Sequence, residues 1–270
     1  MPLAPRGDRR VHYEDLPAEG TVAGLPVLLV PGTGSGARQF GTLPRRFARR
    51  GFRCLTTSPV GMPPSSTLPG AFDLDEAARD LAATLDAAGV ERAIPVGTSL
   101  GGKIALCACH LLPDRFPRLV MLSSTARVTE RGRRIHRFFA VIAERLPPDA
   151  IGDAIAPFLF GSTFIEERPK VVDDIVRAVR PGEQARGLMA AQARAQSDFD
   201  GEGRARALRC PALVVAGTED TLTPPADVRA TADLIDGAQY LEIEDAGHSL
   251  LLESARVFDE VAAFCTAATP

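Results

Sequence analysis

The sequence predicts an α/β fold in which a mostly parallel central sheet carries helices on both faces and an inserted helical cap. Short apolar runs alternate with segments of helical periodicity along most of the chain, which is the pattern of a parallel sheet buried on both sides. One long stretch has only helical patterns, which indicates the insertion. The chain has 270 residues, 45% of them hydrophobic, so it can form one large core.

Six apolar runs are expected to form the sheet. They cover residues 26–31, 52–57, 92–97, 118–124, 212–217 and 239–244. Residues 9–17 would add a leading strand, which we expect to be antiparallel.

Two helices between these strands have readable ends. Asp73 and Glu76 stand at capping-box spacing before an apolar stripe, and Gly89 follows where the helix should stop. A second helix is expected to begin at Thr223, with a proline in its first turn, and to end before Gly237.

The alternation breaks between residues 126 and 205, where helical patterns are interrupted by prolines and no strand is recognisable. We therefore predict a core of residues 1–125 and 206–270, and a helical cap of residues 126–205. The cap should cover the carboxyl edge of the strands, where open α/β sheets bind ligands. Five of its phenylalanines are candidates either to line an acyl pocket or to pack as core: Phe138, Phe139, Phe158, Phe160 and Phe164.

Charge and cysteine content narrow the class of protein. A net charge of −3 argues against nucleic acid as the main partner. With no leader-like segment or long apolar span, and an odd, scattered set of five cysteines, we expect a reduced, cytoplasmic protein without membrane association. Cys107 and Cys109 would point to different faces of one helix, so they favour packing over metal binding. We expect neither a metal nor a cofactor.

Residues 97–106, GTSLGGKIAL, fit two motifs. As G-x-x-x-x-G-K they would form a phosphate-binding loop, but Ile104 stands where that loop needs a hydroxyl for magnesium. As G-x-S-x-G they form a sharp strand-to-helix turn that exposes Ser99, and Gly97 and Gly101 are the small neighbours that such a turn needs. The serine interpretation is favoured. Lys103 misses the S-x-x-K spacing by one residue and is expected on the helix surface.

A serine nucleophile needs a base, and the base needs a carboxylate to orient it. His248 follows the last predicted strand, in a loop at the same sheet edge as Ser99. Asp220 follows the strand of residues 212–217 and is the preferred acid, ahead of Glu219 and Asp245. The other histidines are expected to be structural or solvated: His12, His110 and His136.

The order Ser99, Asp220, His248 and the loops GTSLGG, GTEDTLTP and AGHSLLLE resemble the α/β-hydrolase superfamily over nearly the whole chain. The resemblance implies an oxyanion hole formed by the backbone N–H groups of Leu100 and Thr33. Because residue 99 is a serine, the branches that attack with a carboxylate, epoxide hydrolases and haloalkane dehalogenases, are disfavoured. Ser249 replaces the tryptophan common in ring-cleavage-product hydrolases.

The function expected is therefore hydrolysis of a small-molecule ester, lactone or thioester through an acyl-enzyme. Two alternatives stay open: non-hydrolytic use of the same site by a lyase, cyclase or acyltransferase, and a hydrolase-like ligand receptor with slow turnover. The arginines of residues 126–139 are interpreted as a solvated face, with docking of an acidic substrate or a carrier protein as the alternative.

Overall fold

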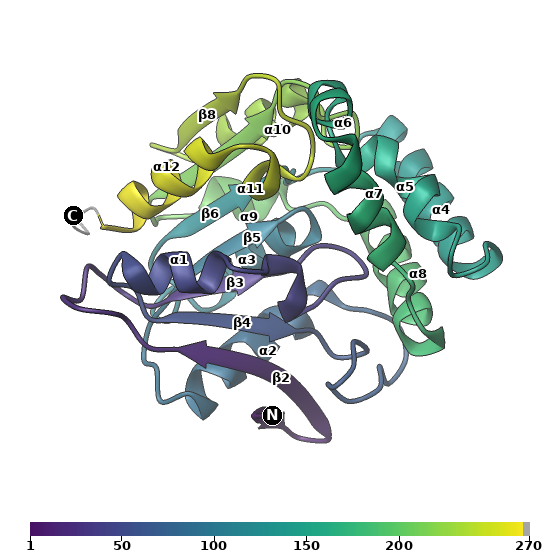
Figure 1. The fold of residues 1–270 in the computed structure, drawn as a ribbon. Helices are drawn as coiled ribbons and strands as arrows, with labels where there is room; N and C mark the ends of the chain where they lie inside the picture. The colour runs from purple at the N-terminus through teal and green to yellow at the C-terminus, as the bar shows by residue number, and fades with distance from the viewer. Residues whose placement is uncertain (267–270) are drawn as a thin grey trace.

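The computed structural model describes residues 1–266 and places an eight-stranded sheet at the centre of the chain (Figure 1). The strand order is β1-β2-β4-β3-β5-β6-β7-β8, and all neighbours from β4 to β8 pair in parallel. The strands are β1 (Leu3–Arg6), β2 (Arg9–Leu16), β3 (Val27–Val30), β4 (Cys54–Ser58), β5 (Ile94–Thr98), β6 (Leu119–Leu122), β7 (Ala212–Gly217) and β8 (Gln239–Ile243).

The six predicted core strands are present, with ends shifted by two residues or fewer. The leading strand β2 pairs antiparallel with β4, as expected. Strand β1 was missed, because its four residues include Pro5 and carry no apolar alternation that could be recognised without its partner β2.

Helices cover both faces of the sheet (Figure 1). Leu28 and Val30 of β3 face the core beneath α2 and α3, whereas Val27 and Leu29 face the core beneath α1 and α12. This alternation of two buried faces explains why the strand is apolar at every position. The helices of these layers are η1 (Ala37–Phe40), α1 (Leu43–Arg49), α2 (Leu74–Ala87), α3 (Leu100–Leu111), α10 (Pro225–Ala232), α11 (Leu250–Glu253) and α12 (Ala255–Thr266).

The two predicted helix starts can be compared with the structure. The Asp73 carboxylate accepts hydrogen bonds from the N–H groups of Asp75 and Glu76 and so caps α2. The Glu76 carboxylate instead binds Arg6 and Arg79, so only half of the capping box forms. Helix α10 starts at Pro225, two residues later than predicted.

All the helices between β6 and β7 belong to one segment, residues 130–207, called here the helical segment. Figure 1 shows it at the end of the sheet toward which the parallel strands point. It has apolar clusters of its own, centred on α4, α5 and α8 and on Phe160 with Val172. Its helices are α4 (Glu130–Arg145), α5 (Ile151–Leu159), α6 (Ser162–Glu167), α7 (Pro169–Ala178), α8 (Glu183–Ser197) and α9 (Glu202–Ala207).

Candidate active site

Ser99 lies on a strained turn between β5 and α3. Its backbone has φ 55° and ψ −120°, a conformation that a residue with a side chain rarely adopts. Ser99 N–H donates to the carbonyl of Leu122, and Ser99 C=O accepts from the Ser124 hydroxyl at 2.7 Å. The loop after β6 therefore holds the strained turn in place, and strain that is held in this way is typical of functional sites.

The glycines around Ser99 are required by close backbone contacts. A Cβ on Gly97 would overlap the carbonyl of Gly101, and a Cβ on Gly101 would overlap the carbonyl of Val30. A Cβ on Gly102 would collide with the Ser124 side chain. The G-x-S-x-G spacing thus reflects packing of the first turn of α3 against β3 and the loop after β6, which is the geometry that the serine interpretation predicted.

Asp220 and His248 form a buried, hydrogen-bonded pair. The distance from Asp220 Oδ2 to His248 Nδ1 is 2.8 Å, and the two residues are 3% and 5% exposed. Thr223 contributes its hydroxyl to Oδ2 and its N–H to Oδ1, which also accepts the N–H of Leu222. Burial by itself raises the pKa of Asp220, but the positive charge of His248 and the hydrogen bonds from His248 and Thr223 outweigh it and hold this pKa below its usual value.

The two alternative candidates for the acid, Glu219 and Asp245, do not contact His248. Glu219 turns toward the helical segment, where its oxygens accept the N–H and the hydroxyl of Thr163 at 2.9 and 2.7 Å. Asp245 is exposed and has a positive φ of 55°, and its N–H donates to the Thr218 hydroxyl. Of the three candidates, Asp220 is the one that contacts His248.

The backbone N–H groups of Thr33 and Leu100 have no hydrogen-bond partner among residues 1–266, although Gly32, Gly34 and Ser99 beside them all donate. Gly32 lies next to the nucleophile turn, because a Cβ there would be 3.5 Å from the Ser99 Cβ. Two free N–H groups beside a serine, one of them in the first turn of α3, are suited to donate hydrogen bonds to a developing oxyanion.

Helix α8 of the helical segment holds the Thr33 loop. Gln192 Oε1 accepts the Gly34 N–H at 2.7 Å, and Gln196 Nε2 donates to the Thr33 hydroxyl at 2.8 Å. A Cβ on Gly34 would lie 3.2 Å from the Met189 side chain, so the helix packs directly on the loop. Sequence reasoning missed this contact, because nothing local links residues more than 150 positions apart.

Glu253 of α11 was also missed. Its carboxylate accepts the N–H groups of Gly161, Gly247 and Ser249 at 2.8–2.9 Å, so it joins the helical segment to the loop on both sides of His248. Burial raises its pKa, against the opposing effect of these hydrogen bonds and of the His248 charge. The sequence feature that could have indicated this role is a carboxylate four residues after Ser249, at the end of a short helix.

Lys103 contradicts the prediction of a surface side chain. It is 1% exposed and lies one turn after Ser99 on α3. The prediction failed because α3 is covered on every side in its first three turns, so helical periodicity does not reveal a solvent face. His136 on α4 is buried at 8% exposure, His12 at 4%, and His110 is exposed.

The five candidate phenylalanines pack among themselves and with the apolar clusters of the helical segment. Phe139 meets Phe158 edge-on at 5.5 Å, and Phe160 stacks on Phe164 at 5.7 Å. Phe138 is 48% exposed. In α4, Arg133 and Arg134 pair with Glu130 of the same helix, which suits a solvated face.

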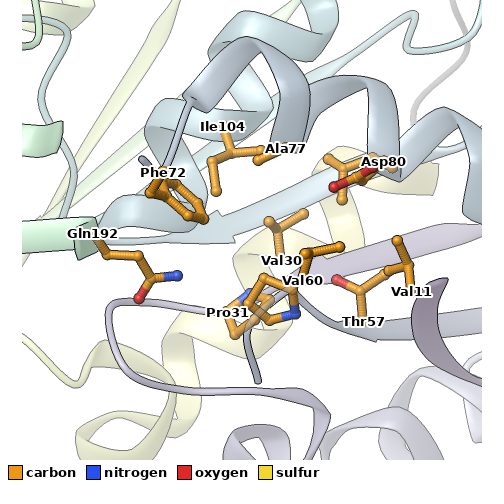
Figure 2. Close-up of a pocket in the computed structure, with 12 residues that line it drawn as sticks. Val11, Val30, Pro31, Thr57, Val60, Phe72, Ala77, Asp80, Ile104 and Gln192 are labelled. Carbon is orange, nitrogen blue, oxygen red and sulfur yellow. The ribbon is translucent and has the colours of Figure 1, made fainter. Parts of the chain in front are cut away.

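A small pocket of about 20 Å³ lies between β3, β4, α2 and α3 (Figure 2). Val30, Pro31 and Ile104 line it, and the Gln192 amide points into it. Neither Ser99 nor His248 lines this pocket, so it adjoins the candidate site without containing it. Gln192 Nε2 is buried without a hydrogen-bond partner among the described residues.

Three negative findings concern residues 1–266 alone. No group of three or more His, Cys, Asp or Glu side chains is arranged to hold a metal ion. All five cysteines are free, and Cys107 and Cys109 are buried in the core as expected. The helices of this part of the chain are too short or too polar to span a bilayer.

Known proteins resemble this chain over most of its length. Residues 26–255 match the family model described as alpha/beta hydrolase fold. A protein of Azorhizobium caulinodans, provisionally named carbamate hydrolase RutD, is 30% identical over 264 residues, covering 97% of this chain and 96% of its own. A 3-oxoadipate enol-lactonase of Acinetobacter baylyi is 26% identical over 195 residues, covering 72% of this chain and 71% of its own.

Solved structures with a similar fold include an enol-lactonase and an esterase. The crystal structure of an enol-lactonase from Burkholderia xenovorans superposes with a TM-score of 0.87 at 26% identity, covering 98% of this chain and all of the other. A thermophilic esterase from Thermogutta terrifontis superposes with a TM-score of 0.82 at 25% identity, covering 98% of this chain and 97% of its own.

Proposed function

The chain belongs to the α/β-hydrolase fold family, and from this premise we propose that it is a serine hydrolase that cleaves a carboxylic ester, lactone or thioester of a small molecule. The single observation that carries the proposal is the buried Asp220–His248 pair at 2.8 Å, at the sheet edge where Ser99 ends its strand on a strained turn. A positioned nucleophile and an oriented base are the parts that acyl transfer needs.

In the proposed first half-reaction, Ser99 Oγ attacks the carbonyl carbon while His248 Nε2 takes the hydroxyl proton. The carbonyl oxygen becomes an anion and is bound by the N–H groups of Thr33 and Leu100, each stabilising it by roughly 3 kcal/mol. The intermediate then expels the alcohol or thiol, which receives the proton from His248. The acyl group stays on Ser99 as an ester.

In the second half-reaction, a water molecule attacks this ester and gives one proton to His248. The second tetrahedral intermediate collapses, Ser99 leaves with the proton from His248, and the carboxylic acid is released. Asp220 stays ionised throughout and fixes the imidazole orientation through Nδ1, a role that its lowered pKa supports.

The helical segment has a proposed role as a cap over this site. The contacts of Gln192 and Gln196 with the Thr33 loop, and of Gly161 with Glu253, tie it to both sides of the catalytic machinery. The free cysteines are the ground for proposing the cytoplasm as its location, since a reducing compartment keeps thiols unpaired.

A carbamate is the second candidate substrate, favoured by the name of the Azorhizobium relative. The same attack on a carbamate carbonyl would leave a carbamoyl-enzyme. A lyase, cyclase or acyltransferase, and a receptor with slow turnover, would use the same site without repeated hydrolysis.

The test combines labelling with turnover. A fluorophosphonate probe should modify Ser99 in the folded protein, as found by peptide mapping, and Ser99→Ala should abolish labelling. A panel of short and medium p-nitrophenyl esters, lactones, thioesters and aryl carbamates should then show multiple turnovers that disappear in both Ser99→Ala and His248→Ala. Labelling at another residue would overturn the assignment of Ser99, and at most one turnover across the panel would favour the receptor.

A further inference from the structure

Lys103 is a buried cation without a counter-charge. It makes no hydrogen bond or ion pair with any residue in 1–266, although it is only 1% exposed. Burial is the one cause that acts on its pKa and lowers it to about 8, whereas a nearby carboxylate would have raised it. Several side-chain nitrogen and oxygen atoms elsewhere in the chain are fully enclosed and have no hydrogen-bond partner. Lys103 Nζ is not among these fully enclosed atoms, so a small part of its surface is accessible.

This ammonium group lies at the nucleophile end of α3. Lys103 follows Ser99 by four residues, which places their Cα atoms about 6 Å apart along the helix axis. His136 reaches the same region from α4 of the helical segment. Its pKa falls to about 3, first because of burial and then because of the positive charges of Lys103 and His248. Lys103 and His248 of the core are therefore near enough to His136 of the helical segment for their charges to act on it.

A charge in such a place is costly unless something pairs with it. The chain has 31 Lys and Arg residues, of which only Lys103 and Lys170 are lysines. The buried arginine Arg118 and the half-buried Arg204 both have acceptors, a backbone carbonyl for Arg118 and the Asp75 carboxylate for Arg204. Lys103 differs from both, because its ammonium group is buried and has no acceptor among residues 1–266.

We propose that Lys103 binds a carboxylate of the substrate, so that the ester, lactone or thioester cleaved at Ser99 is a monoanion. The inference rests on the proposed function for the identity of the reacting group, but the binding site stands on Lys103 and its surroundings alone. One ammonium balances one negative charge, which favours a carboxylate over a phosphate dianion. His136 is neutral because of its lowered pKa, so its ring has one N–H to donate.

The first experiment measures substrate preference. Monoethyl esters of succinic, glutaric and adipic acid are compared with neutral ethyl esters of matched length, by following ethanol release. The ratio of kcat/KM for anionic to neutral ester should exceed one for the best pair and should fall at least about 30-fold in Lys103→Met, mainly through KM, because truncation leaves the carboxylate unpaired. Lys170→Met, at the exposed lysine, is the matched control and should keep the wild-type ratio.

The second experiment needs no catalysis. In protein labelled with ¹³C at lysine Cε, the two lysines give two sets of signals, which the Lys170→Met variant assigns. Titration with succinate, glutarate and adipate should shift the Lys103 signal saturably for at least one diacid, and the corresponding diamides should not. The same titration of Lys103→Gln, followed by the melting temperature, should show no diacid stabilisation where the wild type shows it.

The two experiments separate the two proposals. If no ester is cleaved but the Lys103 signal shifts with a diacid, the anion site is supported and hydrolysis is not. If esters are cleaved with a preference for the neutral member that Lys103→Met leaves unchanged, or if only the Lys170 signal responds, the anion site is wrong whatever the outcome for hydrolysis.

Discussion

Gln196 Nε2 donates a 2.8 Å hydrogen bond to the hydroxyl of Thr33, across 163 residues of sequence. One side of this contact belongs to a helix inserted between β6 and β7, and the other to the loop that follows β3. With Gln192 bonded to the Gly34 N–H one turn earlier, helix α8 fixes the loop that carries half of the proposed oxyanion hole. If the Thr33 N–H binds the oxyanion as proposed, the helical segment acts on the chemistry as well as on substrate access.

The first prediction concerns this coupling. Gln192→Leu should lower kcat about 10- to 100-fold with a smaller change in KM, because the Gly34 N–H loses its acceptor and the neighbouring Thr33 N–H loses its fixed direction. Steady-state kinetics on one p-nitrophenyl ester would measure it. Gln184→Leu, at an exposed position of the same helix, is the control and should leave kcat within about twofold. Equal losses in both variants would point to the helix as a whole instead of the loop.

The second prediction separates Asp220 from Asp245. Asp220→Asn should reduce kcat on the order of 10³- to 10⁴-fold, since the amide no longer holds the imidazole in the required tautomer. Asp245→Asn should have little effect, because asparagine tolerates the positive φ of that position and the side chain is exposed. Circular dichroism would check that both variants fold, and comparable losses of kcat would leave Asp220 without its assigned role.

The features that the sequence could predict are those with a local cause. Ser99, Asp220 and His248 each follow a strand whose apolar run is visible, and parallel strands bring such ends to one edge of a sheet. The glycines around Ser99 are demanded by contacts within a few residues or with the adjacent strand. Local patterns therefore sufficed for the central sheet and for the placement of Ser99, Asp220 and His248 after its strands.

The features that were missed depend on contacts between distant segments. Strand β1 exists because residues 9–12 pair with it, and Glu253 matters because Gly161 and Gly247 approach each other beside it. Lys103 was placed on the surface because one helix, taken alone, gives no sign of which further layers cover it. Burial of a charge is a tertiary property, and helical periodicity cannot report it.

The third prediction tests Glu253 as a positioning residue for the His248 loop. Glu253→Gln should lower kcat about tenfold or more, because an amide offers one oxygen where the carboxylate accepts three N–H groups with two. A purely structural role would lower the melting temperature alone. The diagnostic is therefore kcat measured well below the melting temperature of the variant, where an unchanged value would assign Glu253 to stability only. Glu260→Gln on the exposed face of α12 serves as the control.

The last prediction concerns the effect of the buried charge of Lys103 on the free energy of unfolding. Its folded pKa of about 8 lies below the ordinary value of 10.5, so between these two pH values the unfolded chain holds a proton that the folded chain does not. The contribution of Lys103 to the free energy of unfolding should therefore rise with pH across this window, by up to about 1.4 kcal/mol per unit. Below pH 8 the full cost of the buried charge is present.

Lys103→Met removes the charge and keeps the length of the side chain, so the variant should be more stable than the wild type at pH 7 and should lose the rise between pH 8 and 10.5. Among the groups that share the environment of Lys103, His136 has a pKa near 3 and stays neutral throughout the window. Burial raises the pKa of Cys107, one turn further along α3, from 9.0 to about 12, so this thiol makes the stability of both proteins fall with pH above 9. The difference in stability between variant and wild type at each pH therefore isolates the effect of Lys103. Urea unfolding at four pH values, with Lys170→Met as the control, would measure both effects. A variant that is less stable at pH 7 would mean that Lys103 has a stabilising partner in solution, and the proposed carboxylate site would then lose the unpaired charge on which it rests.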